Sequence, residues 1–270
     1  MSLLNSVLDS VFDVLLRPLA SLPALASLAL VSLATAIVML LVVRGTSNQR
    51  ALDEVKRQIH AALFEIRLFN DDLRAIFRAQ GDMLRHNATY LRLSLVPMLW
   101  MIVPLALVIA QLQFHYGYQG LEAGRPVLLT AHLRSGERAA LEAPAGIRVD
   151  ESDAIWFPAA RDLVWRITPE TPGEYVLTLR VGNGAFTKTL RASNGLARRS
   201  PERLTAGFIN EFLYPAEPPL PSDGPVESIR VAYPERDIDV FGWKLNWMVV
   251  FFVLSIVFAF VLRKPFGVTI

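Results

Sequence analysis

Residues 23–43 read PALASLALVSLATAIVMLLVV and carry no charged side chain. This stretch decides the fold, because a bilayer core about 30 Å thick needs about 20 apolar residues in a helix. The run is therefore long enough to cross a membrane. The alternative is a buried core helix of a soluble protein.

Two further apolar runs lie downstream. Leu95–Leu112 is uncharged and contains two prolines, which membrane helices tolerate when neighbours satisfy the backbone. Trp247–Leu262 is shorter, but it extends upstream through Val240 if Lys244 reaches the interface with its ammonium group. Three uncharged runs in one chain of 270 residues argue against buried core helices. The sequence therefore predicts three transmembrane helices, at residues 23–43, 94–113 and 243–262.

The charges around these runs predict an orientation. Residues 44–93 are rich in basic side chains, and the tail 263–270 begins with Arg263-Lys264, whereas Arg17 is the one base before the first run. Cytoplasmic loops carry the excess of Lys and Arg. We therefore expect 44–93 and 263–270 in the cytoplasm, and the N-terminus and 118–239 outside a bacterial inner membrane.

The first 22 residues predict an amphipathic helix in the outer interface. Apolar side chains such as Leu4, Val7 and Val11 recur at helical spacing, while Asp9 and Asp13 take the other face. The alternative is a frayed terminus.

Residues 44–93 have an apolar seam that predicts a helical hairpin. Seam positions at steps of three and four are Leu52, Val55, Ile59, Ile66, Phe69, Leu73 and Ile76. Because the chain must leave and re-enter the membrane on this side, we expect an antiparallel coiled coil. A turn at Phe69–Asp72 gives arms of nearly equal length, whereas a turn at Gly81–Asp82 does not. A simple connector is the alternative, but a connector needs no apolar face.

The outer segment 118–239 changes to short alternating runs, which predict a β-sandwich. The expected strands are Val127–Leu133, Leu163–Thr168, Tyr175–Val181, Phe186–Arg191 and Ile229–Tyr233. Asn183-Gly184 predicts a tight hairpin turn, because both residues accept positive φ. Tyr175, after Pro172-Gly173, resembles the tyrosine corner of immunoglobulin-like domains. Ser200–Pro225 is rich in proline and predicts a linker with a helical patch at Leu204–Leu213.

The sequence gives no reason to expect an enzyme. The four histidines lie on separate predicted elements without metal-ligand spacing, and the chain has no cysteine. No nucleophile elbow or phosphate loop occurs. We expect no catalytic residues, no metal site and no cofactor, and the net charge of +2 gives no reason to expect nucleic acid as a specific ligand.

The order of these elements resembles the YidC/Oxa/Alb insertase superfamily, in particular its three-span branch with archaeal YidC-like proteins and the insertase subunit of the ER membrane complex. The resemblance rests on Leu15–Leu19 before the first run, Val42–Arg44 at its end, the hairpin, Leu93–Leu99 and Val103–Leu105. The large outer domain departs from that branch, in which this connection is short.

The resemblance implies insertion or chaperoning of nascent or tail-anchored membrane segments through a polar groove open to the cytoplasm. Further partners that it implies are the lipid bilayer and the ribosome or another membrane subunit. The groove residues expected from it are Arg44, Ser32, Thr35, Ser94, Gln111 and Ser255.

Two alternatives stay open at this level. Arg44 fits an ordinary positively charged membrane anchor equally well, and each polar side chain could instead make a hydrogen bond between helices. The alternative function is a non-catalytic membrane scaffold that binds one partner through the outer sandwich and another through the coiled coil.

Overall fold

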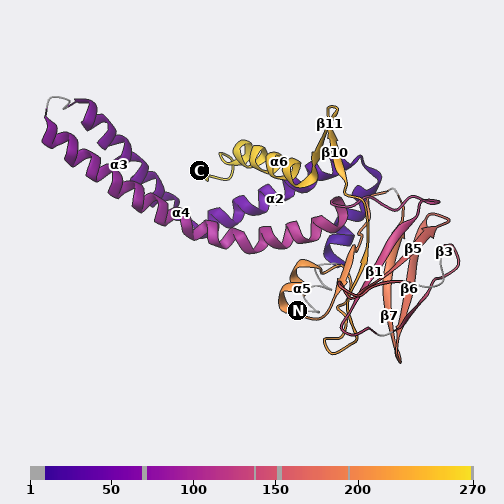
Figure 1. The fold of residues 1–270 in the computed structure, drawn as a ribbon. Helices are drawn as coiled ribbons and strands as arrows, with labels where there is room; N and C mark the ends of the chain where they lie inside the picture. The colour runs from indigo at the N-terminus through magenta and orange to yellow at the C-terminus, as the bar shows by residue number, and fades with distance from the viewer. Residues whose placement is uncertain (1–9, 69–71, 137, 151–153, 194, 269–270) are drawn as a thin grey trace. The chain divides into compact units, whose positions relative to one another are not determined.

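The computed structural model describes residues 10–68, 72–136, 138–150, 154–193 and 195–268, without the side chains of residues 73 and 75. About half of the chain is helical, and the rest includes antiparallel β-sheets (Figure 1). The chain divides into two compact units, one of residues 1–27 with 107–250 and the other of residues 28–106 with 251–270. The helices are η1 (Arg17–Ser21), α2 (Ala24–Thr46), α3 (Gln49–Leu68), α4 (Leu73–Tyr116), α5 (Phe208–Leu213) and α6 (Trp247–Leu262).

Among the described residues, two helices are long and apolar enough to cross a membrane. They are α2 and, within α4, the stretch Ile76–Tyr116. Pro97 and Pro104 both lie inside α4, which continues from the second hairpin arm into the apolar run without a break. The first two predicted spans therefore each fall on a long apolar helix.

The third apolar run forms a shorter helix than predicted. Strands β10 (Asp237–Val240) and β11 (Trp243–Asn246) occupy its expected upstream extension, so α6 has only 16 residues. The chain turns at Phe241 and Gly242, where φ is +53° and +90°. Asn246 then caps α6 by accepting a hydrogen bond from the Met248 backbone N–H at 2.9 Å.

Helices α3 and α4 form a hairpin. The Lys56 ammonium lies 5.6 Å from the centre of the Tyr90 ring, so the two arms contact each other (Figure 1). The competing turn at Gly81–Asp82 is wrong, because both residues lie inside α4. Most of the expected turn at Phe69–Asp72 lies outside the described residues, which end at Leu68 and resume at residue 72.

Burial follows the predicted seam on the first arm. Leu52, Val55 and Ala62 are buried in α3, and Ile59 and Ile66 are half-buried. On the second arm Ala79 is fully buried and Ile76 is half-buried. Phe69 lies outside the described residues, as does the side chain of Leu73.

Only the second half of the predicted N-terminal helix lies among the described residues. Residues 10–16 are helical, and η1 follows with Pro18 in its first turn. Leu16 is buried, whereas Val14 and Leu15 are exposed. Residues 1–9 of the prediction lie outside the described part of the chain.

The β domain, residues 118–246, is built from antiparallel pairs. One sheet has the strand order β3-β5-β1-β9-β8, with β4 also pairing β5, and another has the order β2-β6-β7. The strands of these two sheets are β1 (Val127–Leu133), β2 (Ala139–Glu142), β3 (Ile147–Val149), β4 (Ile155–Phe157), β5 (Asp162–Pro169), β6 (Gly173–Val181), β7 (Gly184–Ala192), β8 (Glu202–Leu204) and β9 (Val226–Val231).

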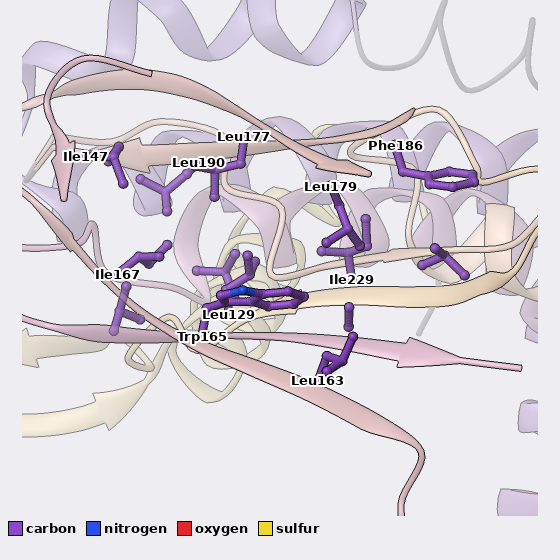
Figure 2. Packing of buried hydrophobic residues seen from close by; sticks show 14 of the residues in the cluster. Leu129, Ile147, Leu163, Trp165, Ile167, Leu177, Leu179, Phe186, Leu190 and Ile229 are labelled. Carbon is purple, nitrogen blue, oxygen red and sulfur yellow. The ribbon is translucent and has the colours of Figure 1, made fainter. Parts of the chain in front are cut away.

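Apolar side chains from both sheets form one core. Figure 2 shows Leu177, Leu179 and Leu190 facing Trp165 and Leu129. These side chains are at most 2% exposed. Period-two alternation on β1 and β7 delivers them to one face, as expected for strands with one buried face.

The strand predictions in this domain are confirmed, with ends that differ by a few residues. The hairpin turn lies one residue before the predicted Asn183-Gly184, because Gly184 already belongs to β7. Gly182-Asn183 joins β6 to β7, with Gly182 at φ +56°. The Tyr175 hydroxyl donates to the Thr171 carbonyl at 2.7 Å, as in a tyrosine corner. The predicted linker Ser200–Pro225 is wrong, because β8 within it pairs with β9. The helical patch there is shorter than predicted and forms α5.

Candidate functional site

The structure brings one of the predicted groove residues into contact with another helix. Ser32, fully buried on α2, donates a hydrogen bond to the Phe251 carbonyl of α6 at 3.4 Å. Thr35, one turn further along α2, is also buried. Ser32 therefore makes a hydrogen bond between helices, which the sequence analysis left open as the alternative to a place in the polar groove.

The other predicted groove residues are dispersed. Arg44 is exposed in the last turn of α2, where a cation is favourable next to the helix C-terminus. Ser94 on α4 is half-buried, and the Ser255 hydroxyl on α6 is buried without a hydrogen-bond partner among the described residues. Gln111 is buried in α4, in the compact unit that contains the β domain.

A row of exposed apolar side chains lies on the second arm of the hairpin. Phe77, Leu84 and Leu91 are 70%, 67% and 63% exposed and lie seven residues apart, so they share one face of α4. We call these three residues the hairpin stripe. The sequence analysis missed it because only one seam was sought among the apolar residues of this segment. A second apolar repeat at heptad spacing was the pattern that could have identified it.

The apolar runs themselves are also exposed. Only 6% of the most apolar window of α4 is buried inside the protein. A core helix of a soluble protein buries most of such a window, and a large exposed apolar surface marks an interaction with lipid or with another protein. Exposed side chains include Leu99, Trp100 and Val103 on α4, Leu41 on α2 and Val261 on α6.

A polar cleft of about 700 Å³ lies beside the β domain. Side chains from residues 13–20, from His115, from β6 and β7, from residues 196–200 and 216–218 and from Tyr233 line it. We call it the arginine cleft because Arg17, Arg191, Arg198 and Arg199 are among these residues.

One wall of the arginine cleft is fixed by a hydrogen bond between two residues that lie far apart in the sequence. His115, in the last turn of α4, is 3% exposed and lies with its Nε2 3.2 Å from an Asp13 carboxylate oxygen. Its Nδ1 lies 3.0 Å from the Gln111 carbonyl oxygen. The hydrogen bond with His115, helped by the charge of Arg198, holds the pKa of Asp13 below its ordinary value despite partial burial. This pair attaches residues 10–16 to the end of α4.

The opposite wall is held by a buried ammonium. Lys188 on β7 is 1% exposed and donates to the Ser200 hydroxyl at 2.8 Å and to the Glu217 carboxylate. Burial opposes the charged form of Glu217, but the Lys188 charge and hydrogen bonds from Lys188, Ser200 and the Thr189 backbone together hold its pKa below the ordinary value. This network anchors residues 200–217 to the sheet, which explains why that segment is not a free linker.

Arg199 is the most deeply buried arginine of the cleft. It is 1% exposed, and its terminal nitrogens donate to the carbonyls of Tyr118, Ser193, Gly195 and Ala197. Its Nε has no hydrogen-bond partner among the described residues. Burial, with repulsion from Arg236, lowers the pKa of Arg199 to about 10. Arg199 therefore keeps its charge at neutral pH while it ties the backbone at Tyr118 to the segment that precedes it in sequence.

The sequence analysis missed this cleft, although two patterns pointed to it. Lys188 interrupts the buried positions of β7 between Phe186 and Leu190, and a charged residue at an inward position needs a buried partner. Arg198-Arg199 places two bases side by side immediately before the segment Ser200–Pro225, which was interpreted as a linker. No group of three or more His, Cys, Asp or Glu side chains in the described part of the chain could hold a metal ion.

A scan of the chain against models of known protein families finds no match, and a search of curated protein sequences finds none either.

Proposed function

We propose that this chain is a membrane protein insertase or membrane-segment chaperone. In this proposal α2, the apolar part of α4 and α6 span a bacterial inner membrane. The α3–α4 hairpin lies in the cytoplasm, and the β domain is an immunoglobulin-like sandwich outside. The observation that carries the proposal is the hairpin stripe, an exposed apolar row on a helix that continues into an apolar run.

The hairpin stripe has the chemistry of a binding surface for apolar helices. Apolar side chains at helical spacing bind an apolar partner helix by removing area from water, at about 25 cal/mol per Å². The seam of the hairpin is buried separately on Leu52, Val55 and Ala79. The stripe therefore stays exposed to solvent after the hairpin has formed, which supports a role in binding a client.

The length of α6 supports the insertion step. Its 16 residues measure about 24 Å, compared with about 30 Å for the hydrocarbon core. A short span favours a locally thinner bilayer. A thinner bilayer shortens the distance over which polar flanks of a client leave water, where each unsatisfied group costs several kcal/mol. Arg44, at the cytoplasmic end of α2 in this proposal, would attract acidic flanks.

The test is insertion by purified protein reconstituted in liposomes, with a client that has one apolar segment and a short acidic tail. We expect Leu84→Asp to reduce insertion at least fivefold. We expect Arg44→Ala to reduce insertion as well, whereas Arg44→Lys should keep much of the activity. Glu65→Gln, at an exposed position of α3, is the matched control and should insert as the wild type does. If the wild type inserts no client above empty liposomes, the insertase proposal is wrong.

The heptad spacing of the stripe favours a second candidate function, a scaffold that pairs with a helix of one partner protein. A photoreactive residue at Leu84 in living cells distinguishes the two. An insertase gives crosslinks to many nascent membrane proteins, and these disappear when translation is blocked. A scaffold gives one partner whose crosslink persists.

A further inference from the structure

The last turn of α4 holds two other segments of the chain in place. The ring centres of Tyr116 and of Trp247, the first residue of α6, are 6.5 Å apart, and the Trp247 indole N–H donates to the Gln113 side chain at 3.1 Å. The ring of Tyr214, which directly follows α5, lies 6.2 Å from the Phe114 ring. All of these residues belong to the same compact unit. The start of α6 and the end of α5 therefore both lie against the end of α4.

Helix α5 exposes its apolar side chains more than its polar ones. Phe208, Ile209 and Leu213 are 71%, 67% and 50% exposed. Asn210 and Glu211, by contrast, are half-buried, and the Asn210 amide donates to a backbone carbonyl of the preceding segment at 3.1 Å. A helix on the surface of a soluble domain has the opposite arrangement, with its polar face in water. Exposed apolar side chains that lie together mark a surface that contacts lipid or another protein.

A second exposed apolar surface lies on the arm formed by β10 and β11, which pair only with each other in the described part of the chain (Figure 1). Trp243 on β11 is 74% exposed. Strand β11 ends at Asn246, and α6 follows with no loop between them, with its Val249 52% exposed. The exposed apolar surface of α6 therefore continues along the chain onto the arm.

We propose that α5 and the β10–β11 arm rest on the outer surface of the membrane, with Phe208, Ile209, Leu213 and Trp243 at the boundary between lipid headgroups and chains. Lipid is the occupant because both segments are held at the end of α4, and only 6% of the most apolar window of that helix is buried inside the protein. If α4 crosses the bilayer, its last turn lies at the outer interface, and α5 and Trp243 lie within a few residues of the contacts with that turn. Trp is enriched at this level, and interfacial helices bury their apolar face about 5–10 Å deep there.

These two attachments besides the spans would fix the orientation of the β domain on the membrane. The inference rests on the spanning topology of the proposed function, but not on insertion activity.

Phe157 on β4 provides a matched control, because it lies at the far end of the main sheet. Glu235, which follows β9, bridges to Tyr118, two residues after α4, so the end of β9 is the end near α4. Strand β1 runs antiparallel to β9, so its residue His132 lies at the other end. His132 pairs with Asp162, which pairs in turn with Phe157. Phe157 is apolar and 48% exposed, and in this topology it lies in water.

The test uses spin labels on the full-length protein in vesicles of phosphatidylcholine and phosphatidylglycerol. The chain has no cysteine, so Ile209→Cys, Trp243→Cys, Phe157→Cys and Val103→Cys each carry one label. Collisions of each label with oxygen, which concentrates in lipid, and with a water-soluble nickel chelate are measured by power saturation. Val103→Cys, at a position 63% exposed in the apolar run of α4, is the control in lipid. Phe208→Cys replaces Ile209→Cys if that variant melts earlier than the wild type.

We expect about threefold fewer nickel collisions at Ile209→Cys and Trp243→Cys than at Phe157→Cys, together with more oxygen collisions. Nickel access equal to that of Phe157→Cys places α5 and the arm in water and overturns the inference. Low access to both reagents shows that protein covers these positions, from a second copy or a partner, and also overturns it. If Val103→Cys is open to nickel, α4 does not cross the bilayer, and the spanning topology fails together with the inference. If Val103→Cys is in lipid while Ile209→Cys and Trp243→Cys are in water, the inference fails alone.

Discussion

Lys188 shows how one residue turns an apolar strand into a structural anchor. Its neighbours at inward positions of β7, Phe186 and Leu190, are apolar and buried. An ammonium at such a position is costly unless it is paired and hydrogen-bonded. Glu217 and Ser200 provide that pairing, and in doing so they bring a proline-rich segment onto the sheet.

Removing the charge of Glu217 should therefore destabilise the β domain strongly. Breaking a buried pair by changing one partner costs about 3–5 kcal/mol, because the other charge stays buried without compensation. We expect Glu217→Gln to lower the melting temperature of the detergent-solubilised protein, measured by intrinsic tryptophan fluorescence, to which the core residue Trp165 contributes. Glu170→Gln, at an exposed position of the same domain, should leave the melting temperature unchanged.

The same carboxylate should make stability depend on pH in the acid range. The folded-state pKa of Glu217 lies below its ordinary value of 4.5, so the unfolded chain binds more protons between the two values. This contribution to stability is complete above about pH 4.5 and is lost as the pH falls through the folded-state pKa. We expect the acid-induced drop in melting temperature to be smaller in Glu217→Gln than in the wild type. An identical drop in both proteins would contradict this assignment.

Phe241 is a residue whose backbone conformation conflicts with its type. Its φ of +53° is unfavourable for a bulky L-residue, and its side chain is 97% exposed, so no burial compensates for the strain. Asn accepts this conformation, and Asn-Gly is the preferred pair for such a hairpin turn. We expect Phe241→Asn to stabilise the β10–β11 hairpin by about 1 kcal/mol in detergent, measured by amide hydrogen exchange.

Gly242→Ala, at the neighbouring position of the same turn, should have the opposite effect and destabilise the β10–β11 hairpin. It adds a Cβ at φ +90°, with no atom within 4 Å to clash, so backbone strain alone should speed exchange in the hairpin. If Phe241→Asn also speeds exchange, the Phe241 ring makes a stabilising contact with the surrounding detergent or lipid.

At the scale of elements, the helices and strands that could be predicted from the sequence are those with a regular local spacing of apolar residues. The apolar runs, the hairpin seam and the strands β1, β5, β6 and β7 follow from local alternation or helical spacing. Strand β8 and residues 200–217 were missed, because long-range partners on β9 and at Lys188 hold them. The start of α6 was misplaced because a positive-φ turn at Phe241 has no ordinary sequence pattern.

The predictability of the candidate sites divides in the same way. The position of Ser32 on an apolar helix was visible, but its acceptor, the Phe251 carbonyl, lies 219 residues away in sequence. The arginine cleft joins residues 13–20, the end of α4 and four parts of the β domain. A site assembled from segments so distant in sequence leaves no local spacing to recognise.

The buried seam between α3 and α4 can be tested by a single substitution. Val55 is 7% exposed in the seam, so Val55→Asp buries an unpaired carboxylate and should destabilise the hairpin by about 2 kcal/mol. We expect faster hydrogen exchange throughout α3 in the full-length protein. Leu84→Asp places the same side chain on the exposed stripe and should leave exchange in α3 unchanged. Equal effects of both substitutions would show that α3 and α4 do not pair through this seam.

At the scale of the whole molecule, the proposed function depends on which side of the membrane each part occupies. The 16 residues of α6 are the weakest element in that topology, because a helix of about 24 Å spans only a thinned bilayer or extends with flanking residues at the interface. Trp243, exposed on β11 just before its start, and Arg263 and Lys264 after its end, are residue types that anchor spans at interfaces. These residues make a full crossing by α6 the expected arrangement.

Single cysteines test the topology directly, because the chain has none of its own. We place them at Arg78 on the hairpin, Ala145 in the β domain and Lys264 after α6, all exposed positions. In intact cells, a membrane-impermeant thiol reagent should label Ala145→Cys, whereas Arg78→Cys and Lys264→Cys should react only after permeabilisation. Labelling of Lys264→Cys together with Ala145→Cys would mean that α6 returns without crossing, which removes the thinned-bilayer argument but keeps the hairpin in the cytoplasm. Labelling of Arg78→Cys would place the hairpin stripe outside the cell, away from nascent chains, and would exclude insertion from the cytoplasm as its function.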